Sequence, residues 1–228
     1  MSFSRGEWAK EKSEIALALG NGECGGGYGE AILILCATIS AMAAEAWPGR
    51  FNDRKRFIEI VVRFSKTSEL PTTISVPLLL QKIEAEKRKQ DSAALKKASL
   101  NFPYARILLG KEVDHSEKEI LQVCPKLPLK KMRDHSYANL LYTLIRSPYS
   151  HQYFPDEDAS PFPMTMDKSA GVSYANRLDA ANPSKGYRHL ICFHLPWLAE
   201  LAINLGQEVD AATLSFPLKP PKRWWADG

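Results

Sequence analysis

The pattern of apolar positions along the chain predicts a mainly α-helical protein. Apolar residues recur at three- and four-residue steps, the spacing that places them on one face of a helix. The stretches concerned are 30–46, 53–65, 136–146 and 187–206. No series of strands with strict alternation is evident, so we expect these helices to pack around one core as a bundle.

Glycine and proline mark where these helices are expected to end. Five glycines lie between Gly22 and Gly29, and the segment WPGR follows the helix at 30–46. Residues 154–186 are rich in Pro, Asp and Ser, which predicts an irregular loop. Pro196 predicts a kink or a restart within the last helix. We interpret residues 1–228 as one domain, with 206–228 as an irregular Pro-rich tail.

Composition and charge are compatible with an ordinary globular protein. Of the 228 residues, 45% are apolar and 25% are charged, which is enough to build a sizeable core. The net charge is +4, from 30 basic and 26 acidic residues. This small excess tolerates an anionic partner, whereas a dedicated binder of duplex DNA is usually more basic.

The cysteines and the N-terminal residues indicate the cellular compartment of the protein. Cys24, Cys36, Cys124 and Cys192 are far apart and form no CxxC pair, which argues against a metal ribbon or a dense disulfide framework. The first residues are charged and contain no apolar signal segment. The most apolar run, 31–47, is short for a membrane span. We therefore expect a reduced cytoplasmic protein with no membrane partner, no metal and no cofactor.

Several polar clusters are weak candidates for chemistry. The glycine-rich loop precedes a helix but lacks the Lys-Ser/Thr of a phosphate-binding loop. His189, Cys192 and His194 would need further ligands to hold zinc. Three consecutive acids at 156–158 have no downstream residues that complete a calcium loop. The last candidate is a nucleophilic set of Ser147, Ser150 and His135. No nucleophile elbow surrounds these residues.

The segment LLYTLIRSPYSH carries the strongest candidate. An apolar helix leads to Arg146, Pro148 follows, and His151 comes five residues after the arginine. Because proline removes a backbone donor and disfavours the α region in the residue before it, we expect a helix break between the two. The break would let the side chains converge. A guanidinium matches phosphate and an imidazole transfers protons, so the pair suits cleavage of a phosphodiester.

This arrangement resembles the HEPN superfamily of all-α domains. Its hallmark is an arginine followed four to six residues later by a histidine, at the end of an apolar helix in the second half of the domain. Arg146 and His151 fit that spacing. Residues 27–65 resemble the early helix pair of the family, and 187–206 resemble its closing helix. Ser147 stands where active members usually carry Asn, Asp or His.

The resemblance implies a function and partners. Active HEPN proteins are metal-independent endoribonucleases of toxin–antitoxin pairs, phage defence and RNA processing, and they leave a 2′,3′-cyclic phosphate. Two chains commonly form one composite cleft. We accordingly expect catalytic Arg146 and His151, supported by Ser147 and Tyr149, in a homodimer that has an RNA substrate and an antitoxin partner. Tyr142 and Tyr149 would supply part of the dimer contact.

Two other functions stay open from the residues alone. One is a catalytically silent helical module that binds RNA or protein, as non-catalytic members of the family do. The other is a small-molecule or nucleotide binder that uses the glycine-rich loop.

Overall fold

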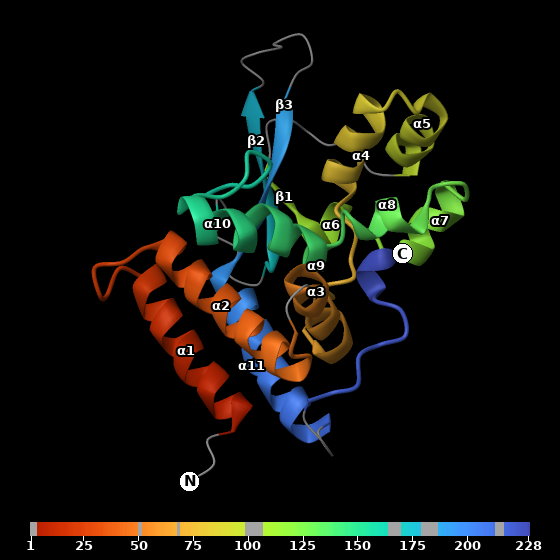
Figure 1. Cartoon of the computed structure of the whole chain (residues 1–228). Coiled ribbons are helices and arrows are strands. Elements are labelled where there is room, and N and C mark those ends of the chain that lie inside the picture. Colours follow the sequence, from red (N-terminus) through yellow and green to blue (C-terminus); the bar gives the residue numbers. More distant parts are fainter. Residues whose placement is uncertain are drawn as a thin grey trace.

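The structure is a computed structural model, and its described part is mainly helical, as the sequence predicts. The helices that pack around the largest core are α1 (Arg5–Gly20), α2 (Tyr28–Ala46), α3 (Asp53–Phe64) and α11 (Leu195–Ala212). The described residues are 4–49, 52–67, 69–98, 107–163, 170–178, 187–212 and 217–228. Figure 1 shows α1, α2 and α11 side by side, with α11 covered by the other two.

The predictions for the early helices are confirmed. In α2 the buried positions follow the expected three- and four-residue steps, from Ile32 to Ala46. In α3 Phe57, Ile60 and Val61 are buried as expected, and the charged Glu59 is buried as well, paired with Arg63 (2.5 Å). The N-terminal residues form the further helix α1, and Ser4 caps it by accepting a hydrogen bond from the amide of Glu7 (3.1 Å).

Helices α1 and α11 approach so closely that two glycines lie at their crossing. A Cβ atom on Gly206 would lie 2.6 Å from the backbone oxygen of Arg5 and 2.9 Å from the Cα of Gly6. Asp210, one turn further along α11, accepts a hydrogen bond from the amide of Gly6 (2.9 Å). The glycine therefore fixes how α11 lies on α1.

Gly206→Ala is expected to lower the free energy of unfolding by about 1–3 kcal/mol, because the added methyl group meets backbone atoms that cannot move aside. Chemical denaturation measures the change. The control is Asn204→Ala, in the same helix. Asn204 is half-buried, and its side chain makes no hydrogen bond among the described residues. It should change stability by about 0.5 kcal/mol or less. Equal stability of Gly206→Ala and wild type would contradict the close crossing.

A second, smaller core lies beside the sheet and is built from short helices. It includes Ile74, Leu79, Leu95, Ile120 and Met132. The helices are α4 (Val76–Ala85), α5 (Lys89–Ala98), α6 (Gly110–Val113), α7 (Glu117–Val123) and α8 (Leu129–Arg133). These helices lie between the two predicted helical stretches 53–65 and 136–146. Figure 1 places α5, α7 and α8 away from the main helical layer.

The expectation of a chain without a series of strands is wrong. A three-stranded antiparallel sheet has the order β1 (Leu108–Leu109), β2 (Val172–Leu178), β3 (Tyr187–Phe193). Strand β2 lies inside the segment predicted to be an irregular loop. Strand β3 replaces the first third of the helix predicted at 187–206. Residues 164–169 and 179–186 of that predicted loop lie outside the described residues.

Two local features explain why residues 187–193 form a strand and the helix follows. Pro196 is the second residue of α11, within the first turn, where its missing amide hydrogen costs nothing. The amide of Leu198 bonds to the carbonyl of His194 (3.0 Å), which starts the helix there. Upstream, β3 pairs along its whole length with β2, from Val172↔Phe193 to Leu178↔Tyr187.

The predicted tail at 206–228 begins later and is partly structured. Helix α11 continues to Ala212, and residues 213–216 lie outside the described residues. Beyond them the chain returns to the core: the Leu218 amide bonds to the carbonyl of Ala46 (2.7 Å), and Trp224 packs edge-on against Trp47. A short 3₁₀ helix, η3 (Trp225–Asp227), then lies against α3 and α8.

A buried carboxyl group joins α4 to the sheet. Asp114 Oδ1 accepts from the amide of Val76 (2.9 Å), and Oδ2 lies 2.5 Å from the hydroxyl of Tyr137 and 2.6 Å from that of Tyr174. The Tyr174 hydroxyl is also 2.8 Å from Ser75 Oγ. Burial raises the pKa of Asp114 to about 7, although the hydrogen bonds to its oxygens act in the opposite direction.

Candidate functional site

The segment around Arg146 and His151 is one uninterrupted helical rod. Helix α9 (Tyr137–Leu140) runs directly into a π-helical segment, η1 (Leu141–Arg146), and then into α10 (Ser147–Gln152). The prediction of a helix at 136–146 is confirmed. The predicted break at Pro148 is wrong, because the helix continues to Gln152 and ends at Tyr153, whose φ is 55°.

The π-helical turn explains how the helix accommodates Pro148. The amide of Ser147 bonds five residues back, to the carbonyl of Tyr142, so the backbone is wider than an α-helix just before the proline. Pro148 cannot donate to the carbonyl of Leu144, four residues earlier. The amide of Asp156 occupies that carbonyl instead (2.9 Å). A contact from the following loop therefore compensates for the missing donor.

Arg146 is anchored between helices rather than projecting freely from a helix end. Its Nε donates to Ser40 Oγ of α2 (3.2 Å), and its Nη2 lies 2.9 Å from Asp53 Oδ2 of α3. The guanidinium carbon is 5.2 Å from the centre of the Tyr142 ring. The Tyr142 hydroxyl donates to the same Asp53 oxygen (2.9 Å). These contacts hold the guanidinium in one orientation.

The remaining nitrogen of this guanidinium faces outward. Nη1 of Arg146 has no hydrogen-bond partner among the described residues. The buried side-chain atoms that lack a partner do not include it, so Nη1 is not a buried atom. It therefore reaches solvent, and the Arg146 side chain is 21% exposed. His151, five residues further on, is exposed. The structure thus offers one fixed N–H donor and one accessible imidazole on the same rod.

The two expected supporting residues have different surroundings. Ser147 is half-buried, and its backbone amide closes the π-helical turn. Tyr149 is buried, and its ring lies close to Gly29 of α2. Burial raises the pKa of the Tyr149 hydroxyl to about 12. The expectation that Tyr142 and Tyr149 supply an outer contact is wrong for Tyr149, which packs α10 onto α2.

The weaker sequence candidates take structural roles. His189 lies on β3 rather than on a helix, and its Nδ1 is 2.8 Å from Asn176 Oδ1. His194 Nε2 is 2.9 Å from Ser173 Oγ. In a strand His189 and Cys192, three residues apart, point to opposite faces of the sheet. No group of three or more potential metal ligands occurs among the described residues.

The acidic residues 156–158 and the glycine-rich loop also have structural roles. Glu157 and Asp158 both pair with Arg188 of β3, at 3.0 and 2.7 Å. The glycine-rich segment forms the turn between α1 and α2, where Gly22 and Gly25 have φ values of 78° and 74°. Such angles favour glycine, which explains the residue type at these two positions without a ligand.

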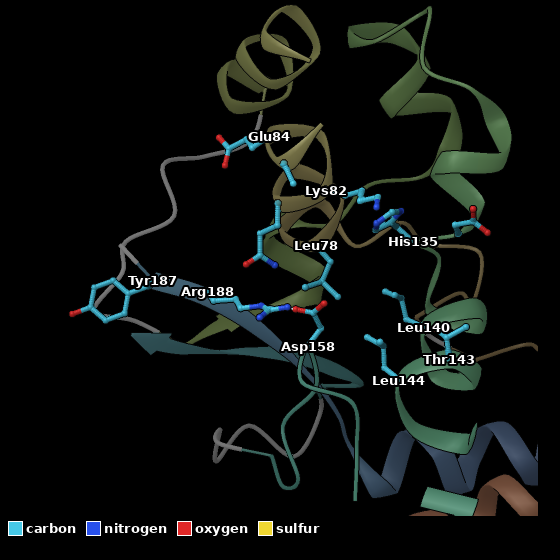
Figure 2. Close-up of a pocket in the computed structure, with 13 residues that line it drawn as sticks. Leu78, Lys82, Glu84, His135, Leu140, Thr143, Leu144, Asp158, Tyr187 and Arg188 are labelled. Carbon is cyan, nitrogen blue, oxygen red and sulfur yellow. The ribbon is translucent and has the colours of Figure 1, made fainter. Parts of the chain in front are cut away.

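Sequence reasoning missed a cleft of about 780 Å³ that lies beside the same rod. Figure 2 shows Leu140, Thr143 and Leu144 of the rod on one side, Arg188 and Asp158 near the sheet, and Lys82 and His135 opposite them. Its walls come from segments far apart in the sequence, so no local motif marks it. The lining residues are Leu78, Gln81, Lys82, Glu84, Ala85, Asp134, His135, Leu140, Thr143, Leu144, Asp158, Tyr187 and Arg188.

One helix of the described part, Tyr28–Ala46, is long and apolar enough to cross a membrane by length and composition. Half of its most apolar window is buried inside the fold, where it packs against α1, α3 and α11. The core helix of a soluble protein satisfies the same criterion.

Comparison with known proteins gives no relative. No family model matches the chain, and neither a curated protein nor a solved structure matches it.

Proposed function

We propose that this chain is a metal-independent endoribonuclease of the HEPN type, with a role as a toxin or in phage defence. The observation that carries the proposal is the anchored guanidinium of Arg146, whose Nη1 reaches solvent, on the same helical rod as the exposed His151. A fixed N–H donor stabilises developing negative charge without reorganising during the reaction. An accessible imidazole accepts and returns a proton.

The proposed reaction needs only the RNA itself. One imidazole takes the proton of the ribose 2′-hydroxyl, and the 2′-oxygen attacks the adjacent phosphorus. The bond from phosphorus to the 5′-oxygen breaks, and a protonated imidazole supplies the proton that this oxygen gains. Arg146 donates to the phosphate oxygens as their charge increases. The products are a 2′,3′-cyclic phosphate and a 5′-hydroxyl.

The geometry of the rod supports a site shared by two copies. In an ideal α-helix, residues five positions apart differ by about 140° in direction and about 7.5 Å in height. Arg146 and His151 of one chain therefore point in different directions. A phosphate contacts both groups more readily when the second comes from another chain. Tyr153 and Phe154, 80% and 58% exposed, follow His151 and offer apolar surface for this contact.

A second candidate is a catalytically silent helical module that binds RNA or protein. The ion pair between Arg146 and Asp53 favours it, because a guanidinium already neutralised by a carboxylate attracts phosphate less strongly. In that case the Arg146 contacts serve to join η1 to α2 and α3. An antitoxin-like partner fits either candidate, since it would cover the exposed end of the rod.

Incubation with single-stranded RNA in EDTA tests the proposal. We expect cleavage that is unchanged by the chelator and products that carry a 2′,3′-cyclic phosphate, which mass spectrometry identifies. Loss of cleavage in EDTA that magnesium restores would contradict the metal-independent mechanism. If RNA is bound but never cut, the silent module replaces the ribonuclease.

A further inference from the structure

The cleft beside the rod contains a histidine whose accessible nitrogen has a defined state. His135 Nδ1 lies 2.8 Å from the backbone carbonyl of Lys131. A carbonyl only accepts hydrogen bonds, so Nδ1 carries the proton, and Nε2 of the neutral ring is an acceptor. Burial lowers the pKa of His135 and outweighs the Lys131 carbonyl and the Asp134 carboxylate, which raise it; the charges of Lys131 and Lys82 also lower it, and the net effect favours the neutral ring.

Nε2 of His135 is directed to solvent space. It has no hydrogen-bond partner among the described residues. The buried side-chain atoms that lack a partner do not include it, so Nε2 is not a buried atom. His135 is one of the residues that line the cleft. A molecule in the cleft that offers an N–H or O–H group therefore meets an acceptor held in place by the backbone.

The charged residues of the cleft are paired with one another or with neighbours. Asp158 pairs with Arg188 (2.7 Å), Asp134 with Arg54 (3.2 Å) and Glu84 with Lys96 (2.5 Å). Lys82 lies 3.8 Å from Glu86 at the rim. Among the described residues, three carboxylates and two cations line the cleft. An anionic ligand would face more carboxylates than cations, so the charge inventory favours a neutral ligand.

The rest of the lining favours a ligand with an apolar face. Leu78, Leu140 and Leu144 supply apolar surface from two different elements. A volume of about 780 Å³ is in the usual range for small-molecule sites. Simple sugars carry hydroxyl groups around the ring and present only a small apolar face, whereas amino acids and phosphates carry charge. A nucleobase is neutral, presents a flat apolar face and offers N–H donors at its edge.

We propose that this cleft binds a nucleobase, presented as a free nucleoside or within a single-stranded chain, through a hydrogen bond to His135 Nε2. The site is separate from Arg146 and His151, and it does not depend on the ribonuclease proposal. If the chain does cut RNA, the cleft would add a preference for the base that occupies it.

Titration with adenosine, cytidine and guanosine, followed by calorimetry and by the proton NMR signals of His135, tests the proposal. At least one nucleoside should bind saturably and shift these signals. Its 5′-monophosphate should bind no more tightly than the nucleoside, because the added charge meets Asp158 and Glu84. A monophosphate that binds at least tenfold more tightly would overturn the assignment of a neutral ligand.

Two substitutions of the same histidine separate the hydrogen bond from the fold. In His135→Asn the amide nitrogen replaces Nδ1 and keeps the bond to Lys131, but no atom replaces Nε2. Affinity should fall by about tenfold, as expected for one lost hydrogen bond. In His135→Gln the amide oxygen reaches the Nε2 position and should restore part of the affinity. Equal affinity in wild type and His135→Asn would remove His135 from the site.

His151→Ala is the control that separates the two proposals. It should leave nucleoside affinity unchanged, because His151 is not part of the cleft lining. The absence of saturable binding by all three nucleosides to the folded wild-type protein would overturn the nucleobase assignment, whatever the outcome of the cleavage assay.

Discussion

His151→Ala is expected to reduce cleavage of single-stranded RNA by at least about a hundredfold, the usual contribution of a positioned acid or base. His151 is exposed, and no hydrogen bond or ion pair of its side chain is found among the described residues. Stability should therefore stay within about 0.5 kcal/mol of wild type. Cleavage rates under single-turnover conditions, together with thermal denaturation, measure the two quantities separately.

Arg146→Ala should also abolish cleavage, but it is expected to lower stability as well. The substitution removes the contacts to Ser40 and Asp53 and leaves the Asp53 carboxylate with Tyr142 and the more distant Arg56 as partners. Arg146→Lys keeps the charge but cannot donate from Nε and two terminal nitrogens at once, so it should restore little activity. Cleavage that survives both His151→Ala and Arg146→Ala would place the reaction elsewhere in the molecule.

Mixing the two inactive variants tests whether the site is shared between chains. If Arg146 of one chain acts with His151 of another, a mixed dimer has one complete site. No more than about half of the wild-type activity should return, because half of randomly assembled dimers are mixed and the single cleft of each keeps one arginine and one histidine. No recovery, with both variants shown to exchange chains, would mean that both groups act within one chain or that no shared site forms.

The sequence predicted the helical elements well where periodicity extends over several turns. Helices α2 and α3 were located to within about two residues, because each carries a long buried stripe bounded by glycine, proline or a polar cap. Strand β3 was mistaken for helix because YRHLICF is a short apolar run, and a short apolar run does not distinguish a buried strand from a helix. Pairing with β2 makes this segment a strand.

The candidate site depends on contacts that the local sequence does not reveal. Pro148 predicts a break by its own chemistry, yet the π-helical turn and the bond from Asp156 to the Leu144 carbonyl remove the penalty. Neither is visible in the local sequence. The cleft could not be predicted for a related reason. Its lining comes from α4, the α8–α9 junction, η1 and β3, and only the folded arrangement brings His135 to the same space as Arg188.

Asp114 is expected to make the stability of this protein fall as the pH rises from about 4 to about 7. Its pKa in the folded protein is about 7, whereas the usual value is 3.8, so the folded chain holds a proton there that the unfolded chain has lost. At about 1.4 kcal/mol per pH unit, the loss amounts to about 4 kcal/mol by pH 8. A protonated Asp114 can donate to the Tyr174 hydroxyl, which in turn donates to Ser75.

Asp114→Asn isolates this contribution because an amide does not titrate. The variant should be less stable than wild type at pH 5, since one oxygen cannot serve both Val76 and the two tyrosines. The deficit should shrink by about 3 kcal/mol between pH 5 and pH 8, because only the wild type loses stability through Asp114 and the pKa of about 7 lies about two pH units above pH 5. Asp227→Asn, which removes an exposed carboxylate beside Lys55, is the control for charge alone. A constant difference between wild type and Asp114→Asn across this range would show that Asp114 is ionised in the folded protein throughout, stabilised by the three hydrogen bonds that it accepts.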